Sequence, residues 1–212
     1  MTISNESRGR IKKVFEPMAL AMGRAGLTPN GLTLIGFGIS VVGAALLAAQ
    51  VWVLGGLVVF IGGAFDMFDG TLARATGAVS PFGAFMDSVF DRWGEAIVYL
   101  GIAWGAVLAG EDATAILATA ALGAAFMVSY TRAKAEGLGF SPGIGMAAIG
   151  VMPREIRLVV LSLGLIIAGA VGNLTILSIA LAIIAIGALI TVIQRILQTR
   201  SQARSATSIA IK

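Results

Sequence analysis

Residues 66–91 read DMFDGTLARATGAVSPFGAFMDSVFD, and this stretch decides how the rest of the chain is interpreted. It carries four carboxylates, on Asp66, Asp69, Asp87 and Asp91, between two apolar segments where charge is not expected. Spacings of three and four residues put side chains on one face of a helix. Each pair is therefore predicted to point in one direction, and two facing helices would gather all four carboxylates in one pocket.

Four unpaired carboxylates at membrane depth would repel one another and stay largely protonated, and a bound divalent metal ion relieves that repulsion. Because the chain contains no His and no Cys, the ligands would be oxygen atoms only. Such a ligand set favours a hard cation, Mg²⁺ or Mn²⁺, over zinc. A plainer interpretation of one such pair is that it belongs to the polar flank of a membrane span.

The composition is that of a membrane protein. Of the 212 residues, 58% are hydrophobic and 12% are charged, a balance typical of chains with several membrane spans. The lack of Cys excludes disulfides and thiolate metal sites. An all-α fold with six transmembrane helices is predicted from six apolar segments, at residues 32–49, 51–65, 96–109, 113–130, 158–171 and 174–193.

The 15 Lys and Arg residues all lie at one side of these predicted spans. The connections at the other side, around residues 50, 111–112 and 172–173, contain none. By the positive-inside rule, both termini and the carboxylate pocket are predicted to be cytoplasmic, in a multi-pass protein of the cell (plasma) membrane. Residues 1–13 are polar and basic without an adjacent apolar core, so no cleavable signal peptide is expected.

The chain is predicted to form a single membrane domain, residues 1–212. Residues 7–24 alternate apolar and basic side chains at helical spacing, which predicts an amphipathic helix in the membrane interface. Residues 26–199 would form the six-helix bundle, and residues 200–212 a tail. Residues 82–109 would be about 42 Å long as a helix, longer than a hydrocarbon core of ~30 Å, so their first turns should lie in a polar cavity.

Small residues and one arginine accompany the carboxylates. Gly70 and Gly83 leave the backbone open to close approach, and Arg74 follows Gly70 by one turn, where its guanidinium could bind a phosphate. Carboxylates, a metal ion and an arginine suit phosphoryl chemistry. The glycines of the apolar segments are typical of close helix packing, and residues 28–31 (Thr-Pro-Asn-Gly) of a helix start.

The pattern D-x2-D-G-x2-A-R-x8-G-x3-D-x3-D at residues 66–91 resembles the signature of the CDP-alcohol phosphotransferase (CDP-alcohol phosphatidyltransferase) family at all eight fixed positions. The resemblance implies an integral membrane enzyme that moves a phosphatidyl group from CDP-diacylglycerol, or a similar CDP-lipid, to an alcohol and releases CMP. It also implies two Mg²⁺ or Mn²⁺ ions per active site, a homodimer, and a lipid bilayer but no nucleic acid as partner.

The same resemblance assigns roles to individual residues. Asp66, Asp69 and Asp87 would bind the metal ions, and Asp91 would bind one ion and accept the proton of the acceptor hydroxyl. The residues matched to the CDP donor are Gly70, Ala73, Arg74, Gly83, Pro29, Asn30, Gly31, Leu32 and Ser80.

A second cluster of basic residues points to an acceptor that carries its own phosphate. Residues 130–139, YTRAKAEGLG, resemble a segment of phosphatidylinositol phosphate synthases and their archaeal relatives, which use inositol 1-phosphate. The residues matched to the acceptor phosphate are Lys134, Arg154 and Arg195, with Arg132 and Arg157 as further candidates. Residues 154–157 read REIR where that group has RPER, which leaves glycerol 3-phosphate open as acceptor. The positive-inside rule accounts for the same residues without a ligand.

A divalent-cation carrier is the alternative from another functional class, because paired aspartates also occur in ion pathways. Against it, the sequence shows no inverted repeat and no acidic residue near the centre of the last three predicted spans. An inactive relative is disfavoured because no motif residue is missing. The sequence therefore favours a transferase that makes phosphatidylinositol phosphate from inositol 1-phosphate.

Overall fold

The structure, a computed structural model, describes residues 16–140, 145–146 and 149–210, and all the regular elements among them are helices. Residues 16–24 are helical, whereas the first part of the predicted interfacial helix, residues 7–15, lies outside the described residues. The long helices that follow are α2 (Pro29–Ala48), α3 (Trp52–Phe65), α4 (Met67–Thr76), α5 (Pro81–Leu108), α6 (Asp112–Gly137), α7 (Arg154–Val171) and α8 (Thr175–Ala210).

Local sequence explains where the key helices begin and end. Thr28 and Ser80 cap α2 and α5, since their hydroxyls accept hydrogen bonds from the third residue of each helix, and a proline follows each cap. Gly77 ends α4 in the left-handed conformation (φ 68°), which glycine adopts at little cost. The chain thus turns sharply between the two halves of the aspartate motif.

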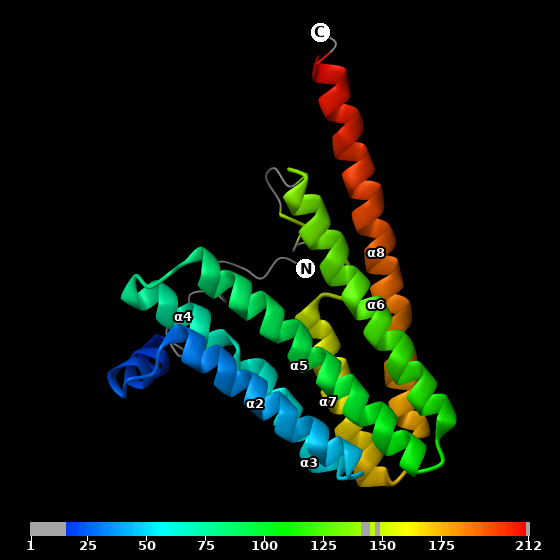
Figure 1. Ribbon diagram of the computed structural model, residues 1–212. Coiled ribbons are helices and arrows are strands. Elements are labelled where there is room, and N and C mark those ends of the chain that lie inside the picture. Colours follow the sequence, from blue (N-terminus) through cyan, green and yellow to red (C-terminus); the bar gives the residue numbers. More distant parts are fainter. Residues whose placement is uncertain (1–15, 141–144, 147–148, 211–212) are drawn as a thin grey trace.

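The bundle has the shape of a wedge (Figure 1). One arm contains α2, α3, α4 and α5, and the other contains α6 and α8. The arms meet at the lower end of Figure 1, where glycines of α5 let the backbone of α2 approach so closely that a Cβ at Gly101 or Gly105 would collide with it. Toward the upper end α5 and α6 diverge, and the predicted site lies there.

Among the described residues, four helical segments are long and apolar enough to cross a membrane: Pro29–Ala48, Trp52–Thr76, Asp112–Gly137 and Thr175–Ser205. The second is α3 continued by α4, with only Asp66 between them. Large apolar side chains such as Leu100, Trp104 and Ile186 are more than half exposed on the outside of the bundle. Surfaces of this kind mark contact with a membrane or a partner, and here they indicate a membrane protein.

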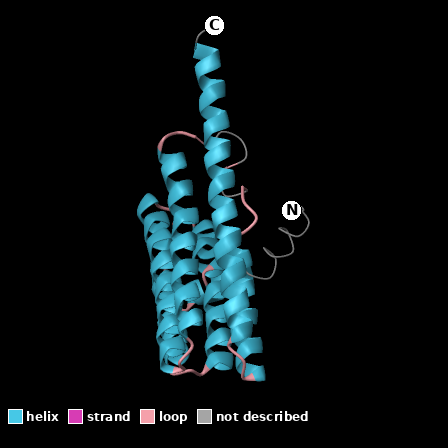
Figure 2. Ribbon diagram, turned by 90° about the vertical axis from the view of Figure 1, so that its right-hand side faces the viewer, coloured by secondary structure: helices cyan, strands magenta, loops and turns pink. Residues whose placement is uncertain are grey.

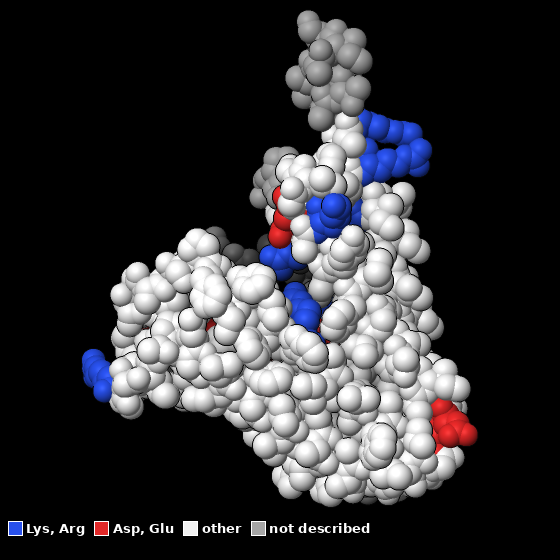
Figure 3. Space-filling view, in the orientation of Figure 1, with Lys and Arg blue, Asp and Glu red and all other residues white. Residues whose placement is uncertain are grey.

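Helices α5 and α7 are outside that set because each has charged residues in its first turns. Those of α5 are Asp87, Asp91, Arg92 and Glu95, and those of α7 are Arg154, Glu155 and Arg157. On the face seen in Figure 3, no Lys or Arg is visible at the lower end, where the connections α2–α3, α5–α6 and α7–α8 lie.

The last helix extends into the predicted tail. Helix α8 does not stop at residue 199 but continues through Ala210, so the predicted tail is largely helical. The side view in Figure 2 shows this helix projecting beyond the rest of the bundle. Residues 200–210 contain no Gly or Pro that would end it, and its Ala, Gln and Arg residues favour helix.

Candidate active site

Two of the four predicted carboxylates, Asp66 and Asp91, share one guanidinium. Asp66 sits between α3 and α4, Asp69 is in the first turn of α4, and Asp87 and Asp91 are in the first half of α5. Arg154, the first residue of α7, reaches between them: its Nη2 lies 2.6 Å from Asp66 Oδ2, and its Nη1 lies 2.8 Å from Asp91 Oδ2. One side chain from α7 therefore joins the two halves of the motif.

Helix α2 supports the carboxylates of the first half. Thr33 Oγ1 donates a hydrogen bond of 2.7 Å to Asp69 Oδ2, and both residues are buried. One turn later on α2, a Cβ atom placed on Gly36 would lie 2.6 Å from Asp66 Oδ1. The face of α2 that carries Thr33 and Gly36 thus provides a donor for one carboxylate and space for the other.

The donor set fits a hard divalent cation. Its ligand atoms are carboxylate oxygens, and Gly36 leaves a space beside Asp66 that a side chain would fill. Within the described residues, no group of three or more Asp, Glu, His or Cys side chains is arranged so that it could hold one ion together. The Arg154 guanidinium lies between Asp66 and Asp91 and neutralises both carboxylates.

Several residues predicted to bind the nucleotide lie at the N-terminal ends of two helices. Pro29, Asn30, Gly31 and Leu32 form the first turn of α2, and Ser80 caps α5. A Cβ at Gly83 would lie 3.4 Å from Asn30 Oδ1, so these first turns are neighbours. Helix N-termini direct unpaired N–H groups and a partial positive charge outward, which suits phosphate.

Helix α4 adds a cation to this region. Arg74 is exposed, and its Nη1 would be 3.2 Å from a Cβ on Gly70, so the guanidinium lies over the glycine that precedes it by one turn. Its Nη2 is 3.4 Å from Thr71 Oγ1, a weak interaction that leaves the guanidinium free to bind a ligand. Ala73 lies beside it on the same helix and is half-buried. The sequence predicted Gly70 and Arg74 as a phosphate site, and their proximity fits that use.

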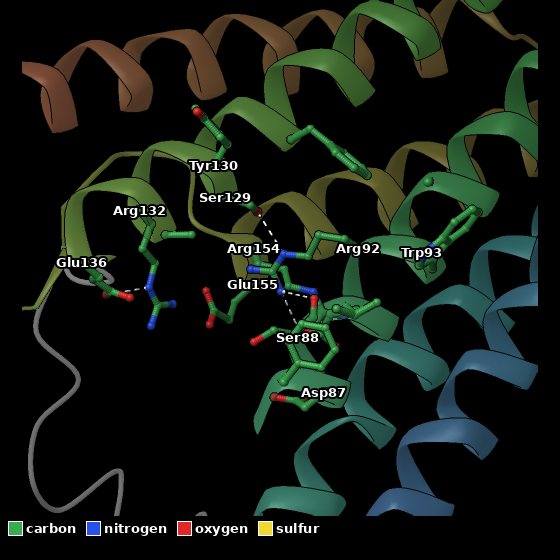
Figure 4. A pocket seen from close by; sticks show the side chains of 16 residues that line it. Asp87, Ser88, Arg92, Trp93, Ser129, Tyr130, Arg132, Glu136, Arg154 and Glu155 are labelled. Carbon is green, nitrogen blue, oxygen red and sulfur yellow. Dashed lines mark hydrogen bonds and ion pairs between the residues drawn. The ribbon is translucent and has the colours of Figure 1, made fainter. Parts of the chain in front are cut away.

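A cavity of about 870 Å³ opens between α5, α6 and the start of α7. Asp87 and Asp91 line it from α5, Arg132 from α6, and Arg154 from α7. Figure 4 shows Arg92 and Arg154 close together at its centre, with Asp87 at one edge and Arg132 beside Glu136 at another. Its remaining wall is largely apolar and includes Phe85, Trp93, Ala96, Phe126 and Tyr130.

The five predicted acceptor-binding residues do not all reach this cavity. Arg132 and Arg154 line it, whereas Lys134 is exposed on α6 and is not among the lining residues. Arg157 is buried and paired with Glu95, and buried Arg195 donates to the carbonyl oxygens of Ile149 and Val128.

Some residues of the site were not predicted. Thr33 and Gly36 have no signal of their own in the sequence, because their importance comes from the packing of α2 against α4. The Arg92 side chain, which donates to Asp91 Oδ2 (3.1 Å) and Ser129 Oγ (3.2 Å), ties α5 to α6. Only the position of Arg92 next to a motif aspartate could have drawn attention to it.

Comparison with known proteins gives one consistent result. The family model described as CDP-alcohol phosphatidyltransferase matches residues 26–193. The archaetidylinositol phosphate synthase of Pyrococcus horikoshii is 34% identical over 92% of this chain and 95% of its own. The phosphatidylinositol phosphate synthase of Mycobacteroides abscessus is also 34% identical, over 92% of this chain and 87% of its own.

Solved structures agree with these relatives. The crystal structure of Mycobacterium tuberculosis phosphatidylinositol phosphate synthase with CDP-DAG bound superimposes with a TM-score of 0.78 and 29% identity, over 88% of this chain and 94% of that one. A structure of the same enzyme in complex with manganese and citrate gives a TM-score of 0.78 at 30% identity, over 87% of this chain and 88% of that one.

Proposed function

This chain belongs to the CDP-alcohol phosphatidyltransferase family, and we propose that it transfers a phosphatidyl group from CDP-diacylglycerol to inositol 1-phosphate, with release of CMP. The product is phosphatidylinositol phosphate. The observation that carries this proposal is that acidic residues of the motif, Asp87 and Asp91, share one cavity with Arg132 and Arg154. A proton acceptor and phosphate-binding cations therefore line the same space.

Asp91 is the proposed base, and Arg154 the proposed partner of the acceptor phosphate. The two side chains are 2.8 Å apart, so a molecule whose phosphate binds Arg154 has its hydroxyls within a few ångströms of Asp91. A phosphorylated polyol meets both requirements, because it carries an anion and a hydroxyl group on one small ring. The second predicted cation on this wall, Arg132, is held by Glu136 at 3.0 Å.

Asp66, Asp69, Asp87 and Asp91 are the proposed ligands of two Mg²⁺ or Mn²⁺ ions. When bound, such ions neutralise the diphosphate of the donor and stabilise CMP as a leaving group. The proposal is supported by the all-oxygen donor set and by a relative whose structure is in complex with manganese. In the chain itself, Thr33 donates a hydrogen bond to Asp69, and Gly36 leaves room for the Asp66 carboxylate.

The CDP group of the donor is proposed to bind where the first turns of α2 and α5 meet α4. Arg74 and Gly70 would contact the diphosphate, and Asn30 and Ser80 the nucleotide. The apolar wall formed by Trp93, Phe126 and their neighbours faces outward between α5 and α6.

The proposed membrane arrangement has six spans, because α5 and α7 join the four segments that are apolar throughout. Their charged first turns would lie in the cytoplasmic cavity rather than in lipid. Both termini would be cytoplasmic, the helix at residues 16–24 would lie in the membrane interface, and the enzyme would act as a homodimer in the plasma membrane.

The experiment is release of CMP by the purified protein in liposomes that contain CDP-diacylglycerol and Mn²⁺. Inositol 1-phosphate, glycerol 3-phosphate and free inositol are compared as acceptors, and the lipid product is identified by mass spectrometry. We expect turnover with inositol 1-phosphate and its loss in Asp91→Asn, which should still bind CDP-diacylglycerol. Turnover with glycerol 3-phosphate alone would reassign the acceptor, and cation flux without CMP release would favour a carrier.

A further inference from the structure

A second ion pair lies one helical turn beyond the pair formed by Asp91 and Arg154. Glu95 follows Asp91 by four residues on α5, and Arg157 follows Arg154 by three residues on α7, so both pairs join the same two helix faces. Arg157 Nε lies 3.0 Å from Glu95 Oε1, and Arg157 Nη2 lies 3.1 Å from Glu95 Oε2. We name the two pairs together the charge ladder, with Asp91–Arg154 as its outer rung and Glu95–Arg157 as its inner rung.

The two rungs differ in burial. In the outer rung the Arg154 side chain is 34% exposed, whereas in the inner rung the Arg157 side chain is 3% exposed. The inner rung is also a bidentate pair, and its arginine donates a third hydrogen bond of 3.2 Å to Met152 O, just before α7 begins. The buried Glu95–Arg157 pair is therefore expected to stay formed. In the outer rung, the more exposed Arg154 can exchange its carboxylate partner for a ligand.

A small cavity of about 50 Å³ connects the rungs to the rest of the site. Its lining includes Asp66, Arg154, Glu95, Arg157 and Tyr99. The Tyr99 hydroxyl is buried and finds no hydrogen-bond partner among the residues that the structure describes. Because these polar groups face a cavity that is large enough for an ordered water molecule, the inner rung and Asp66 line one common space.

We propose that Glu95 and Arg157 are a positioning pair for Arg154. They fix the first turn of α7 against α5, so that the Arg154 guanidinium is held at the depth of Asp66 and Asp91, facing the large cavity. The inference rests on the proposed function in one respect, which is that Arg154 binds the phosphate of the acceptor. It adds two residues that touch neither substrate nor metal and act on the acceptor through Arg154.

The first test separates positioning from general stability. Removing one partner alone would leave a buried unpaired charge and unfold the protein, so the variant is Glu95→Gln/Arg157→Gln, compared with Tyr99→Phe as a control that removes only an unpartnered hydroxyl. We expect the KM for inositol 1-phosphate to rise about tenfold in the double variant, since small displacements of a binding group are costly. The KM for CDP-diacylglycerol should stay within about twofold, because its proposed contacts lie on α2, on α4 and in the first turn of α5, away from Glu95 and Arg157.

Coupling to Arg154 makes this test specific. In an Arg154→Gln background, loss of the inner rung should raise the acceptor KM no further, because the residue that it positions is gone. An equal rise in both backgrounds, or an unchanged KM in a folded double variant, overturns the proposal. Should that variant fail to fold, Glu95→Asp keeps the charge but shortens the side chain, and an acceptor KM equal to that of the wild type would then overturn it.

A second measurement does not depend on the acceptor. Because the chain has no cysteine, Arg154→Cys gives a single thiol whose rate of alkylation reports on the first turn of α7. Loss of the inner rung should accelerate alkylation about tenfold, as expected for a locally loosened segment, whereas Tyr99→Phe should not. An unchanged rate contradicts the positioning role, whereas absence of CMP release by the wild type would contradict only the proposed function.

Discussion

Thr33 Oγ1 donates a hydrogen bond to Asp69 Oδ2 at 2.7 Å, and both residues are only 6% exposed. The residues are 36 positions apart in the chain and are brought together by the packing of α2 against α4. The hydroxyl therefore fixes the orientation of a carboxylate that is proposed to bind metal. Partners of this kind orient metal ligands and contribute to affinity even though they do not touch the ion.

Thr33→Val removes the hydroxyl and keeps the shape of the side chain. We expect the affinity for Mn²⁺, measured by electron paramagnetic resonance, to fall about tenfold, whereas Thr33→Ser should keep most of it. Thr114→Val is the matched control, because Thr114 bonds Ser178 at 2.7 Å on other helices and should alter stability without altering metal binding. Equal metal affinities in Thr33→Val and the wild type would exclude the orienting role.

Gly36→Ala tests whether space beside Asp66 is required. The added Cβ would meet Asp66 Oδ1 at 2.6 Å, so the carboxylate must turn away, and we expect weaker Mn²⁺ binding and slower CMP release. Gly38→Ala is two residues away on α2 and meets nothing within 4 Å. Alanine favours helix over glycine by about 0.5–1 kcal/mol, so both variants should remain folded. Equal Mn²⁺ affinities and equal rates of CMP release in the two variants would contradict the requirement for space beside Asp66.

Arg154→Gln tests the proposed contact with the acceptor phosphate. Hydrogen bonds to charged groups contribute about 1.5–3 kcal/mol, so the KM for inositol 1-phosphate should rise roughly 10- to 100-fold in steady-state assays. Glu155→Gln removes a negative charge from the same cavity and should lower that KM, because repulsion of the phosphate is reduced. A KM that moves in the same direction in both variants would argue against an electrostatic role for this wall.

Removal of the metal ions should abolish turnover without unfolding the protein. Because the carboxylates are proposed to hold the ions that neutralise the donor diphosphate, chelation with EDTA should abolish CMP release, and added Mn²⁺ should restore it. The helices should remain folded, since their packing rests on apolar residues such as Leu47, Ile102 and Leu165, as circular dichroism can show. CMP release that persists in EDTA would contradict the proposal that the reaction requires a bound divalent ion.

The sequence predicted helices well where a local signal was present. Residues 28–31 were expected to start a helix, and α2 begins at Pro29 after its Thr28 cap. The Ser80 cap of α5 has the same form, although it was not predicted as a helix start. The resemblance of residues 66–91 to a family signature was confirmed by the match over residues 26–193.

Long-range partners could not be predicted in the same way. Arg154 and Asp66 are 88 positions apart. No local pattern in the sequence indicates that the first residue of α7 lies between two motif aspartates. Arg157 was predicted as a further candidate for the acceptor phosphate, and Arg195 was matched to that phosphate by the family resemblance. In the folded chain the first pairs with Glu95 and the second with backbone carbonyls, and only tertiary packing decides such choices.

The central claim is that the aspartates of the motif bind divalent ions together. The most direct measurement is the number of Mn²⁺ ions bound per chain, from electron paramagnetic resonance of the purified protein. We predict about two ions for the wild type and a loss of binding in Asp66→Asn/Asp69→Asn/Asp87→Asn, with the variant still folded. Equal Mn²⁺ binding by the wild type and this triple variant would contradict the account.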